Sequence, residues 1–449
     1  MAHASYLVGC PGVGEAIIID PNRDFAPYID AAAKGGMKIT AVTETHIHAD
    51  FLSGAKELAE ATGAKLYLSA EGPADWQYAF ASQAVLVKTG DKITAGSVEL
   101  TVQHTPGHTP EHISFVMRDL GRSEKVAAVF TGDFVFVGDV GRPDLLEQAA
   151  GVKGTQEPGA RSLFQSLQWL KTLPDHILVW PAHGAGSPCG RALGAVPVST
   201  LGYEKSANWA LLMENEDAFV AEVLRGQPEP PAYYAQMKSR NKLGPSRVAE
   251  RPALVRSGDA FRFASPNALV VDVRPSPEYM ESHIYRAIHA PLNKLFTINC
   301  GWFVPYDTDI LLVASDEASA RLAAQEMAMV GLDGVVAWAG PEIVGAVRKA
   351  GGEVRSIPSM AAADLPEGLV ALDVRGASEH EHDPSDSPHA IPYGFLPRRL
   401  ADLDPSVAYA VHCQGGSRSP VAVSILERLG VERLVEVKDG WMGMKALRG

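Results

Sequence analysis

Four short apolar runs in the first half of the chain each lead directly into a polar cluster that contains histidine or aspartate. The runs are rich in valine, isoleucine and other strand-forming residues, so each is expected to be a buried β-strand. Functional side chains of α/β folds gather at strand ends, and four such clusters in series are hard to explain as unrelated loops. The runs and the residues that follow them are 39–43 with His46, His48 and Asp50, 98–102 with His108, 126–130 with Asp133, and 177–180 with His183.

The first of these clusters reads T-H-I-H-A-D-F-L-S-G from residue 45 to residue 54. Alternate positions of an extended segment face the same side, so His46, His48 and Asp50 are expected to share one small space. Imidazole and carboxylate are ligands for zinc or non-haem iron. Many loops of this pattern carry a histidine directly after the aspartate to help hold a second metal, whereas this chain has Phe51, which has no lone pair to offer. The sequence therefore predicts one metal ion rather than two.

The order of the four clusters resembles that of the metallo-β-lactamase fold, an αββα sandwich that binds metal between its sheet edges. The motifs that carry the resemblance are H-x-H-x-D at 46–50, T-P-G-H-T at 105–109, T-G-D at 131–133 and P-A-H at 181–183. Residues 1–226 are more closely similar to the persulfide dioxygenases, and G-D-V-G-R-P-D-L at 138–145 matches the G-R-x-D-L segment of that group. The resemblance implies one iron(II) ion per chain, bound by His46, His108 and Asp133. The neighbours that would order water or hold these ligands are His48, Asp50 and His183.

Two imidazoles and one monodentate carboxylate would leave three positions of an octahedral iron(II) open, which is enough for a persulfide sulfur and dioxygen side by side. Zinc has no redox chemistry and would use the same site only to activate water. The main enzymatic alternative is therefore a zinc hydrolase of the glyoxalase II type, against which Phe51 argues. A plainer alternative, that the histidines are hydrogen-bonded structural residues, is disfavoured because four clusters occur in series.

Two arginines lie near the predicted mouth of this site and could bind a carboxylate or phosphate of a thiol carrier. Arg142 belongs to the segment at 138–145, and Arg191 lies two residues after Cys189, just beyond the last cluster. An ordinary loop with a buried thiol is an equally good interpretation of the segment around Cys189. From residue 227 to residue 258, prolines and charged residues occur without an apolar period, which predicts a linker or an extended arm.

Two later stretches of about 100 residues repeat one another, which predicts a duplicated domain. The segments 269–279 and 369–379 both contain an apolar strand followed by D-V-R and an acidic residue, and their downstream halves also correspond. Both copies resemble the rhodanese fold, a doubly wound parallel sheet with helices on both faces. The predicted domains are 1–226 with the metallo-β-lactamase fold, 227–258 as the linker, 259–352 as the first rhodanese-like copy and 353–449 as the second.

Only the second copy carries the residues of a sulfur-transfer site. A strand at 408–412 runs into C-Q-G-G-S-R-S at 413–419, and a helix is expected from 420 to 429. Backbone N–H donors and the positive end of the helix dipole would favour a thiolate and a bound persulfide anion in such a turn. The loop resembles the rhodanese active-site loop, with Cys413 as the sulfur-accepting nucleophile and Arg418 as a fixed positive charge. The other loop residues expected to bind the sulfur or anion are Gln414, Gly415, Gly416, Ser417 and Ser419. Gln414 replaces the arginine common at this place, which weakens the case for thiosulfate as the sulfur donor.

The equivalent segment of the first copy, L-V-A-S-D-E-A-S at 312–319, contains neither a cysteine nor a glycine turn. Asp316 and Glu317 would also repel an anion there. The first copy is therefore predicted to be inactive and to serve as a packing or oligomer-contact domain. Cys300 lies upstream of this segment and is not a substitute for the missing cysteine.

The composition limits the partners that this chain can have. The formal net charge is −13 and no run is rich in lysine or arginine, which argues against nucleic acid. No stretch approaches about 18 apolar residues and no basic, apolar leader opens the sequence, so neither a membrane span nor a secretory signal is expected. A cytoplasmic location is the default. The 4 cysteines are widely scattered and are expected to be free thiols.

The two resemblances together imply a persulfide dioxygenase joined to a rhodanese sulfurtransferase. The expected partners are a low-molecular-weight thiol persulfide such as glutathione persulfide, dioxygen, and sulfite or thiosulfate, and a homo-oligomer is expected. The identity of the carrier thiol and the direction of sulfur flow through Cys413 stay open. In an alternative from another class, the tandem rhodanese-like half would be a sulfur-carrier or regulatory module in which Cys413 only relays or senses persulfide.

Overall fold

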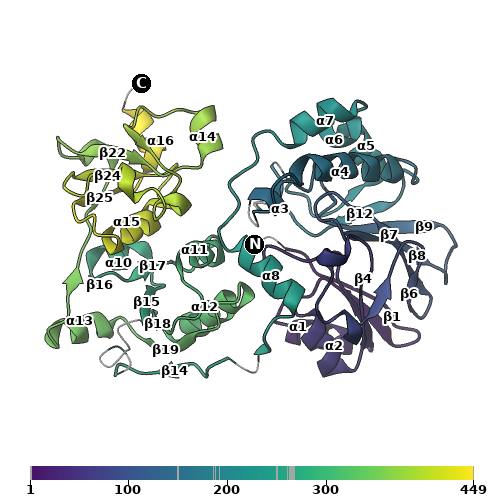
Figure 1. Ribbon diagram of the computed structural model, residues 1–449. Helices are drawn as coiled ribbons and strands as arrows, with labels where there is room; N and C mark the ends of the chain where they lie inside the picture. Colours follow the sequence, from purple (N-terminus) through teal and green to yellow (C-terminus); the bar gives the residue numbers. More distant parts are fainter. Residues whose placement is uncertain are drawn as a thin grey trace. The chain divides into compact units, whose positions relative to one another are not determined.

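The computed structural model of the chain describes residues 3–148, 151–185, 187, 189–191, 193–248, 251–259, 261 and 268–447. The chain separates into two compact units, Met1–Val248 and Ala249–Gly449 (Figure 1). The predicted domains and linker also contain residues that lie outside the described part, namely 1–2, 149–150, 186, 188, 192, 249–250, 260, 262–267 and 448–449. In the described part of the chain, no helix has the length and apolar character needed to cross a membrane.

The first sheet of the first unit has five strands, in the order β1-β2-β3-β4-β5, and two helices cover it. The bounds are β1 Tyr6–Cys10, β2 Glu15–Ile19, α1 Ala26–Lys34, β3 Lys38–Thr43, α2 Ala55–Thr62, β4 Lys65–Ser69 and β5 Val85–Val87, with short 3-10 helices at Ala74–Trp76 and Ala81–Gln83. β1 and β2 form an antiparallel hairpin, and the pairs from β2 to β5 are parallel. Helix α2 ends at Gly63, whose φ of 71° is a left-handed conformation that glycine adopts readily.

The second sheet has six strands, in the order β13-β12-β9-β8-β7-β6. The strand bounds are β6 Lys92–Ala95, β7 Val98–His104, β8 Ile113–Asp119, β9 Val126–Gly132, β12 Leu178–Pro181 and β13 Ser199–Thr200. A separate hairpin joins β10, Val135–Phe136, to β11, Asp139–Val140. The helices of this half are α3 Leu145–Gln148, α4 Gln156–Lys171, α5 Leu201–Ala207, α6 Trp209–Leu212 and α7 Glu216–Val223.

Three hydrophobic cores separate these elements into four layers. One core lies between α1 or α2 and the first sheet, one between the two sheets, and one between the second sheet and the helices α4 to α7. Representative residues are Val42 and Leu58 in the first core, Leu100 and Phe115 in the second, and Val129 and Leu167 in the third. Because successive strand residues face opposite sides, Ile17 and Ile18 enter different cores, which explains why β2 is apolar throughout. This layering, visible in Figure 1, agrees with the predicted αββα sandwich.

Helix α8, Tyr234–Leu243, lies within the segment that the sequence predicts to be a linker. Residues up to Val248 belong to the first compact unit rather than to a connection between units. Four residues of α8 are buried, namely Tyr234, Met237, Lys238 and Asn241. The sequence pattern did not reveal this helix because two of its four buried residues are polar, so its inward face has no continuous apolar stripe.

The second unit contains two parallel five-stranded sheets with the same strand order. The strands of the first, in sheet order, are β14 Val255–Arg256, β19 Val335–Ala339, β18 Ile310–Val313, β15 Leu269–Asp272 and β17 Ile288–His289. Those of the second are β21 Ser359–Met360, β25 Leu434–Val437, β24 Tyr409–His412, β22 Val370–Asp373 and β23 His389–Ala390. Equivalent ion pairs follow β15 and β22, where Arg274 binds Asp272 and Arg375 binds Asp373. The two copies therefore share one topology, as the sequence repeat predicts.

The other elements that the structure describes in the second unit are helices and one two-stranded ribbon. In the first copy they are α10 Ser276–Glu281, α11 Phe296–Phe303, α12 Glu317–Met329, α13 Glu342–Lys349 and a two-stranded ribbon of β16 His283–Ile284 with β20 Val354–Arg355. In the second copy they are α14 Ala377–His382, α15 Ser419–Arg428, α16 Gly440–Ala446 and 3-10 helices at Ala362–Asp364, Tyr393–Phe395 and Leu400–Asp402.

Helix α15 joins the two copies. Every residue from Ser419 to Glu427 is buried. Ser424 Oγ accepts a hydrogen bond from the backbone N–H of His289 at 3.0 Å, and Glu427 Oε2 lies 3.0 Å from Nε2 of His283. The helix that begins at the predicted sulfur site is thus covered partly by its own sheet and partly by the other copy.

Candidate functional site

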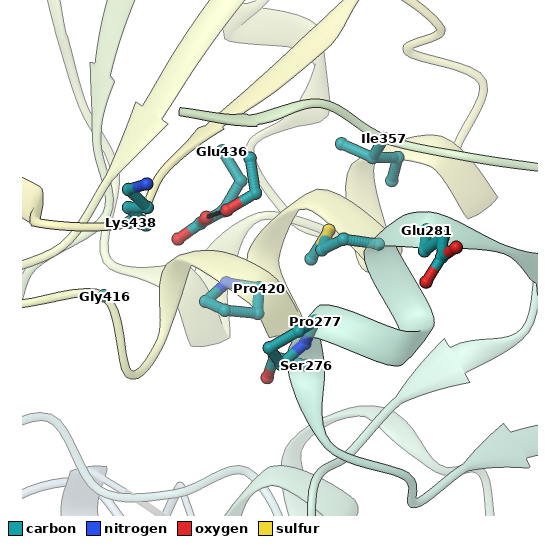
Figure 2. Close-up of a pocket in the computed structure, with 10 residues that line it drawn as sticks. Ser276, Pro277, Glu281, Ile357, Gly416, Pro420, Glu436 and Lys438 are labelled. Atoms are coloured by element: carbon teal, nitrogen blue, oxygen red, sulfur yellow. Dashed lines mark hydrogen bonds between the residues drawn. The ribbon is translucent and has the colours of Figure 1, made fainter. Parts of the chain in front are cut away.

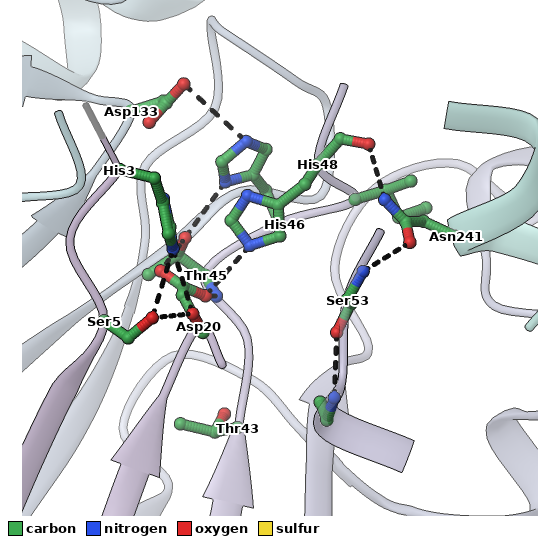
Figure 3. A network of polar contacts seen from close by, with 12 residues as sticks. His3, Ser5, Asp20, Thr43, Thr45, His46, His48, Ser53, Asp133 and Asn241 are labelled. Carbon is green, nitrogen blue, oxygen red and sulfur yellow. Dashed lines mark hydrogen bonds and ion pairs between the residues drawn. The ribbon is translucent and has the colours of Figure 1, made fainter. Parts of the chain in front are cut away.

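The three predicted metal ligands lie together at adjoining strand ends. His46 follows β3, Asp133 follows β9, and His108 lies in the turn between β7 and β8. The Nε2 atoms of His46 and His108 lie 3.9 and 3.5 Å from Oδ2 of Asp133, and each side chain is 1% exposed. One ligand atom from each residue lies within 4.8 Å of the other two. Figure 3 shows His46 and Asp133 facing one another.

Hydrogen bonds orient both imidazoles with Nε2 toward the cluster. Thr45 donates its hydroxyl proton to Asp20 Oδ2 at 2.9 Å, so Thr45 Oγ1 accepts from Nδ1 of His46, also at 2.9 Å. Nδ1 of His108 donates to the backbone carbonyl of Arg142 at 3.1 Å. A proton on Nδ1 leaves the lone pair on Nε2, the usual state of a metal-binding histidine. Burial lowers the pKa of both imidazoles well below 6.5, which keeps them neutral.

The backbone around Asp133 requires glycine at two positions. A Cβ on Gly132, whose φ is 53°, would lie 2.6 Å from Thr45 Oγ1, and a Cβ on Gly141 would lie 1.7 Å from the carbonyl oxygen of Asp133. The N–H of Asp133 donates to Nε2 of His112 at 3.2 Å, so His112 holds the aspartate in place. The sequence analysis did not single out His112. Burial raises the pKa of Asp133 to about 6, and a bound cation would instead keep the carboxylate ionised.

This cluster fits a single cation. Nε2 of His46 and both carboxylate oxygens of Asp133 are buried without a hydrogen-bond partner in the described part of the chain. Buried polar atoms are rarely left in this state unless a ligand or ion satisfies them. Two imidazoles and one carboxylate are a donor set that suits iron(II) or zinc.

The other three predicted neighbours of the site fall into two groups. Nε2 of His48 lies 3.1 Å from Oδ1 of Asp20. Burial alone would lower the pKa of His48, but the Asp20 carboxylate raises it to about 9, and an imidazolium is not a metal ligand. Nε2 of His183 lies 3.4 Å from Oδ2 of Asp50 and 3.4 Å from Oδ1 of Asp133. The structure therefore brings Asp50 and His183 to the cluster and ties His48 to Asp20.

His3 is a residue near the site that the sequence analysis missed. It forms an isolated β-bridge with His183, and its ring centroid lies 4.1 Å from that of Phe51. His3, Asp50 and His183 offer ligand atoms within 4.8 Å of one another. Burial lowers the pKa of His3 to about 4. A second group of metal-capable atoms thus lies beside Phe51, and only tertiary folding brings the start of the chain there.

The two predicted substrate arginines bind protein groups instead. Arg142 is 1% exposed and forms two hydrogen bonds with Asp144, at 2.8 and 2.7 Å. Arg191 pairs with Glu222 at 3.0 Å and lies 5.1 Å from the ring of Trp209. Both guanidiniums are thus committed to carboxylates of the protein, as structural arginines usually are, and neither is proposed below as a substrate ligand.

Helix α8 contributes side chains to the metal loop. Nδ2 of Asn241 donates to the carbonyl oxygen of His48 at 2.9 Å, and its Oδ1 accepts from the N–H of Ser53 at 2.9 Å (Figure 3). Nδ2 of Asn241 also donates to the carbonyl oxygen of Phe51 at 2.8 Å. One turn earlier, Lys238 is 3% exposed. The helix assigned to a linker therefore fixes the loop that carries His48 and Phe51.

Cys413 lies between the end of β24 and the beginning of α15. The backbone N–H of Arg418 donates to Sγ at 3.3 Å, and Oγ of Ser419 lies 3.7 Å from Sγ. Burial opposes ionisation, but these contacts and the charge of Arg418 lower the pKa of the Cys413 thiol below its usual value. Gly416 has a φ of 80°, and a Cβ there would lie 2.0 Å from the carbonyl oxygen of Lys438. The loop is therefore tightly packed, and it favours the thiolate form of Cys413 over the thiol.

The remaining predicted loop residues have distinct environments. Arg418 forms a two-bond ion pair with Glu379, at 2.5 and 2.7 Å. Oε1 of Gln414 accepts a hydrogen bond from Arg375 at 3.1 Å, so the glutamine extends the ion pair at the end of β22. Gly415 and Ser417 are exposed, and among the described hydrogen bonds neither residue contacts the sulfur of Cys413.

The first copy differs from the second at the helix that follows its central strand. Oδ1 of Asp316 accepts from the N–H of Ser319 at 2.8 Å and caps α12. A carboxylate thus caps the helix of the first copy, whereas in the second copy Arg418 is the N-cap residue of α15 and donates its backbone N–H to the sulfur of Cys413. Cys300 is buried in α11, where burial raises its pKa. All 4 cysteines are free, as predicted.

A pocket of about 610 Å³ lies where the two copies meet. It reaches the Cys413 loop at Gly416 and the beginning of α15 at Pro420. Figure 2 shows the residues that line it, including Ser276, Pro277 and Glu281 from the first copy and Glu436 and Lys438 from the second. The copy without a cysteine therefore supplies part of the surface beside the loop that has one.

Family models match both halves of the chain. The model of the metallo-beta-lactamase superfamily matches residues 1–183, and the model of the rhodanese-like domain matches residues 262–340, within the copy that lacks the cysteine. A solved structure named metallo-beta-lactamase, from Staphylococcus aureus subsp. aureus COL, is 42% identical, covers 76% of this chain and 96% of its own, and superposes with a TM-score of 0.71. These matches confirm the predicted fold class.

Two curated relatives point to different activities. A hydroxyacylglutathione hydrolase of Rhodospirillum rubrum is 32% identical over 183 residues, which are 41% of this chain and 62% of the relative. Persulfide dioxygenase ETHE1, mitochondrial, of Bos taurus is 27% identical over 218 residues, which are 47% of this chain and 73% of the relative. This chain thus spans less than two thirds of the hydrolase.

Proposed function

The chain belongs to the metallo-beta-lactamase superfamily and carries a rhodanese-like domain, and from this premise we propose that it is a persulfide dioxygenase joined to a sulfurtransferase. The first activity would convert a low-molecular-weight persulfide, dioxygen and water into a thiol, sulfite and two protons. The second would move sulfane sulfur through Cys413. We assign the first activity to the predicted domain 1–226 together with helix α8, and the second to the predicted domain 353–449.

The observation that carries the first assignment is the buried cluster of His46, His108 and Asp133. It offers two neutral imidazoles and one carboxylate, and Phe51 supplies no ligand beside it. When bound, iron(II) would supply the open coordination positions and the redox chemistry that a reaction with dioxygen needs. The protein's part is to fix the three ligands and to exclude bulk water from them, which the 1% exposure of each side chain supports.

The second assignment rests on the environment of Cys413. Its thiolate would attack the sulfane sulfur of a donor, forming a bond between Sγ and that sulfur and breaking the donor's S–S bond, so that the remainder leaves as a thiolate or as sulfite. An acceptor such as sulfite would then take the outer sulfur and give thiosulfate, which restores the Cys413 thiolate. The Arg418 N–H at 3.3 Å would stabilise the anionic sulfur before and after each transfer.

A thioester hydrolase is the second candidate, and two observations favour it. The hydroxyacylglutathione hydrolase relative is as similar as the dioxygenase relative. The ligand atoms of His3, Asp50 and His183 also form a second group that could hold a second cation beside the first. A site with two zinc ions would activate water rather than dioxygen.

One experiment separates these candidates. The full-length chain, loaded with iron(II) under anaerobic conditions, is mixed with glutathione persulfide, and dioxygen consumption and sulfite are measured. The zinc-loaded chain is mixed with S-lactoylglutathione, and loss of the thioester is measured. Equal amounts of dioxygen consumed and of sulfite plus thiosulfate formed are expected from the iron form. Thioester hydrolysis by the zinc form without dioxygen consumption by the iron form would refute the dioxygenase.

A further inference from the structure

One face of helix α8 contacts the candidate metal site at two points. Residues 234, 238 and 241 are spaced so that they lie along one side of a helix. At one end of this side, the hydroxyl of Tyr234 lies 3.7 Å from Sγ of Cys189, which groups with Asp133 and His183 as potential ligands within 4.8 Å of one another. At the other end, Asn241 binds the loop of His48 and Phe51. Lys238 therefore lies between these two contacts, facing the site.

The ammonium group of Lys238 is buried without a partner. The residue is 3% exposed, and its Nζ has no hydrogen-bond partner in the described part of the chain. Nζ of Lys238 lies 5.8 Å from the centroid of the Trp76 ring. Lys242, one turn further along the same helix, instead donates to the backbone carbonyl of Asp75 at the protein surface. A fully buried lysine without a hydrogen bond is rare and points to a partner that is not part of the protein.

The charges around Lys238 belong to the candidate metal site. Burial lowers the pKa of Lys238, while the negative charges of Glu111, Asp133 and Asp50 raise it. The same ammonium acts in turn on the imidazoles of His46 and His108, which it helps to keep neutral. Lys238 and the three proposed ligands are thus electrostatic neighbours in one buried space.

We propose that Lys238 binds the sulfur-centred anion at the reacting end of the substrate, first the deprotonated terminal sulfur of the persulfide and then the sulfite formed from it. This inference rests on the proposed function and adds a specificity residue to it. The ammonium has three N–H donors, which suit the oxygens of sulfite, and a positive charge, which favours a persulfide anion over a neutral thioester. In this arrangement the reacting end of the substrate lies next to the buried Lys238, and its organic part lies on the side away from the lysine.

The inference is tested by anion binding rather than by turnover. The full-length, iron-loaded chain is reduced, kept anaerobic and titrated with sodium sulfite in a calorimeter. Lys238→Met keeps the length of the side chain and its packing on Trp76 but removes the charge, and Lys242→Met is the matched control on the same helix. We expect sulfite to bind Lys238→Met about 10- to 100-fold more weakly than the unmodified chain, the range for losing a hydrogen bond to a charged group. Lys242→Met should bind sulfite as the unmodified chain does.

A second titration identifies which part of the substrate Lys238 holds. S-methylglutathione carries the carboxylates of a glutathione carrier but no anionic sulfur, so its affinity should be unchanged by Lys238→Met. If Lys238→Met weakens S-methylglutathione and leaves sulfite unchanged, the lysine binds the carrier, and the inference is wrong. Equal sulfite affinity in Lys238→Met and the unmodified chain, or no sulfite binding by the unmodified chain, also overturns it.

The variant itself gives a further check. Because Lys238→Met removes a buried charge without a partner, its melting temperature in the absence of anion should be equal to or higher than that of the unmodified chain. A purely structural role for the ammonium would lower the melting temperature instead. If Lys238→Met does not fold, Lys238→Gln replaces it in the same titrations. The proposed function is tested separately, because dioxygen consumption by the unmodified chain does not depend on these outcomes.

Discussion

The substitution Gly416→Ala should remove sulfur transfer while it leaves the metal site intact. The added Cβ would lie 2.0 Å from the carbonyl oxygen of Lys438, and Gly416 has a φ of 80°. A left-handed conformation costs a residue with a Cβ roughly 1–2 kcal/mol, and overpacking typically costs about 1–3 kcal/mol more. All three atoms nearest to the added Cβ are backbone atoms of Lys438, which cannot rotate away as a side chain would, so we expect the loop itself to shift.

The expected result follows from the position of the loop relative to the sulfur. A shift of about 1 Å would take the N–H of Arg418 out of hydrogen-bond range of the Cys413 sulfur. Loss of a hydrogen bond to a charged group is worth about 1.5–3 kcal/mol, or roughly a 10- to 100-fold lower rate of thiosulfate formation from persulfide and sulfite. Gly415→Ala is the matched control, because its Cβ would meet only Met442 Sδ at 3.7 Å, an ordinary contact.

Two measurements decide this prediction. The rate of thiosulfate formation is compared between the two alanine variants, and dioxygen consumption with added persulfide reports the metal site in each. Gly415→Ala should retain most sulfur transfer, and both variants should consume dioxygen as the unmodified chain does. The prediction is refuted if Gly416→Ala transfers sulfur as fast as Gly415→Ala. The loop would then accommodate a Cβ at residue 416 without moving the N–H of Arg418 away from the Cys413 sulfur.

Three further predictions follow from the two sites. His108→Ala and Asp133→Ala should each lose bound iron as well as dioxygen consumption, since each removes a ligand, and metal analysis showing about one iron per chain in both variants would contradict the assignment. Cys413→Ser should still consume dioxygen but release sulfite in place of thiosulfate, so an unchanged sulfite-to-thiosulfate ratio, after subtraction of the uncatalysed reaction, would mean that the sulfurtransferase does not use this sulfite. The pKa of Cys413 is lowered, so its thiolate should persist below the pH range of an ordinary thiol, and alkylation by iodoacetamide should slow only as the pH falls through that lowered value. Alkylation that follows the pH profile of a free cysteine would show that the loop does not stabilise the thiolate.

The sequence predicted those parts of the site that are encoded locally. A strand followed within a few residues by a potential ligand forms a recognisable pattern, and His46, His108 and Asp133 each lie within four residues of a strand end. The Cys413 loop was equally visible, because a strand, a cysteine, a glycine turn and a helix occur within a few residues. The αββα layering followed in the same way from the order of apolar runs.

The contributions that the sequence did not predict come from positions far along the chain. His3 reaches His183 through a β-bridge between segments 180 residues apart, and nothing near residue 3 indicates this contact. Helix α8 was taken for a linker because its buried face carries Lys238 and Asn241 in place of apolar residues. Arg142 was proposed as a substrate ligand from its motif alone, but Asp144, two residues later, occupies its guanidinium.

The burial of helix α15 has a consequence for any attempt to produce the second rhodanese-like copy as a separate fragment. The helix begins beside the reactive cysteine, and its far half is covered by the copy that has no cysteine, through His289 and His283. An isolated fragment that starts at residue 353 would expose this surface. It would also expose the carboxylate of Glu427, which would no longer have His283 as its partner. Such a fragment should aggregate or bind a foreign partner at that surface. The first copy therefore covers a surface that the second copy would otherwise expose to solvent.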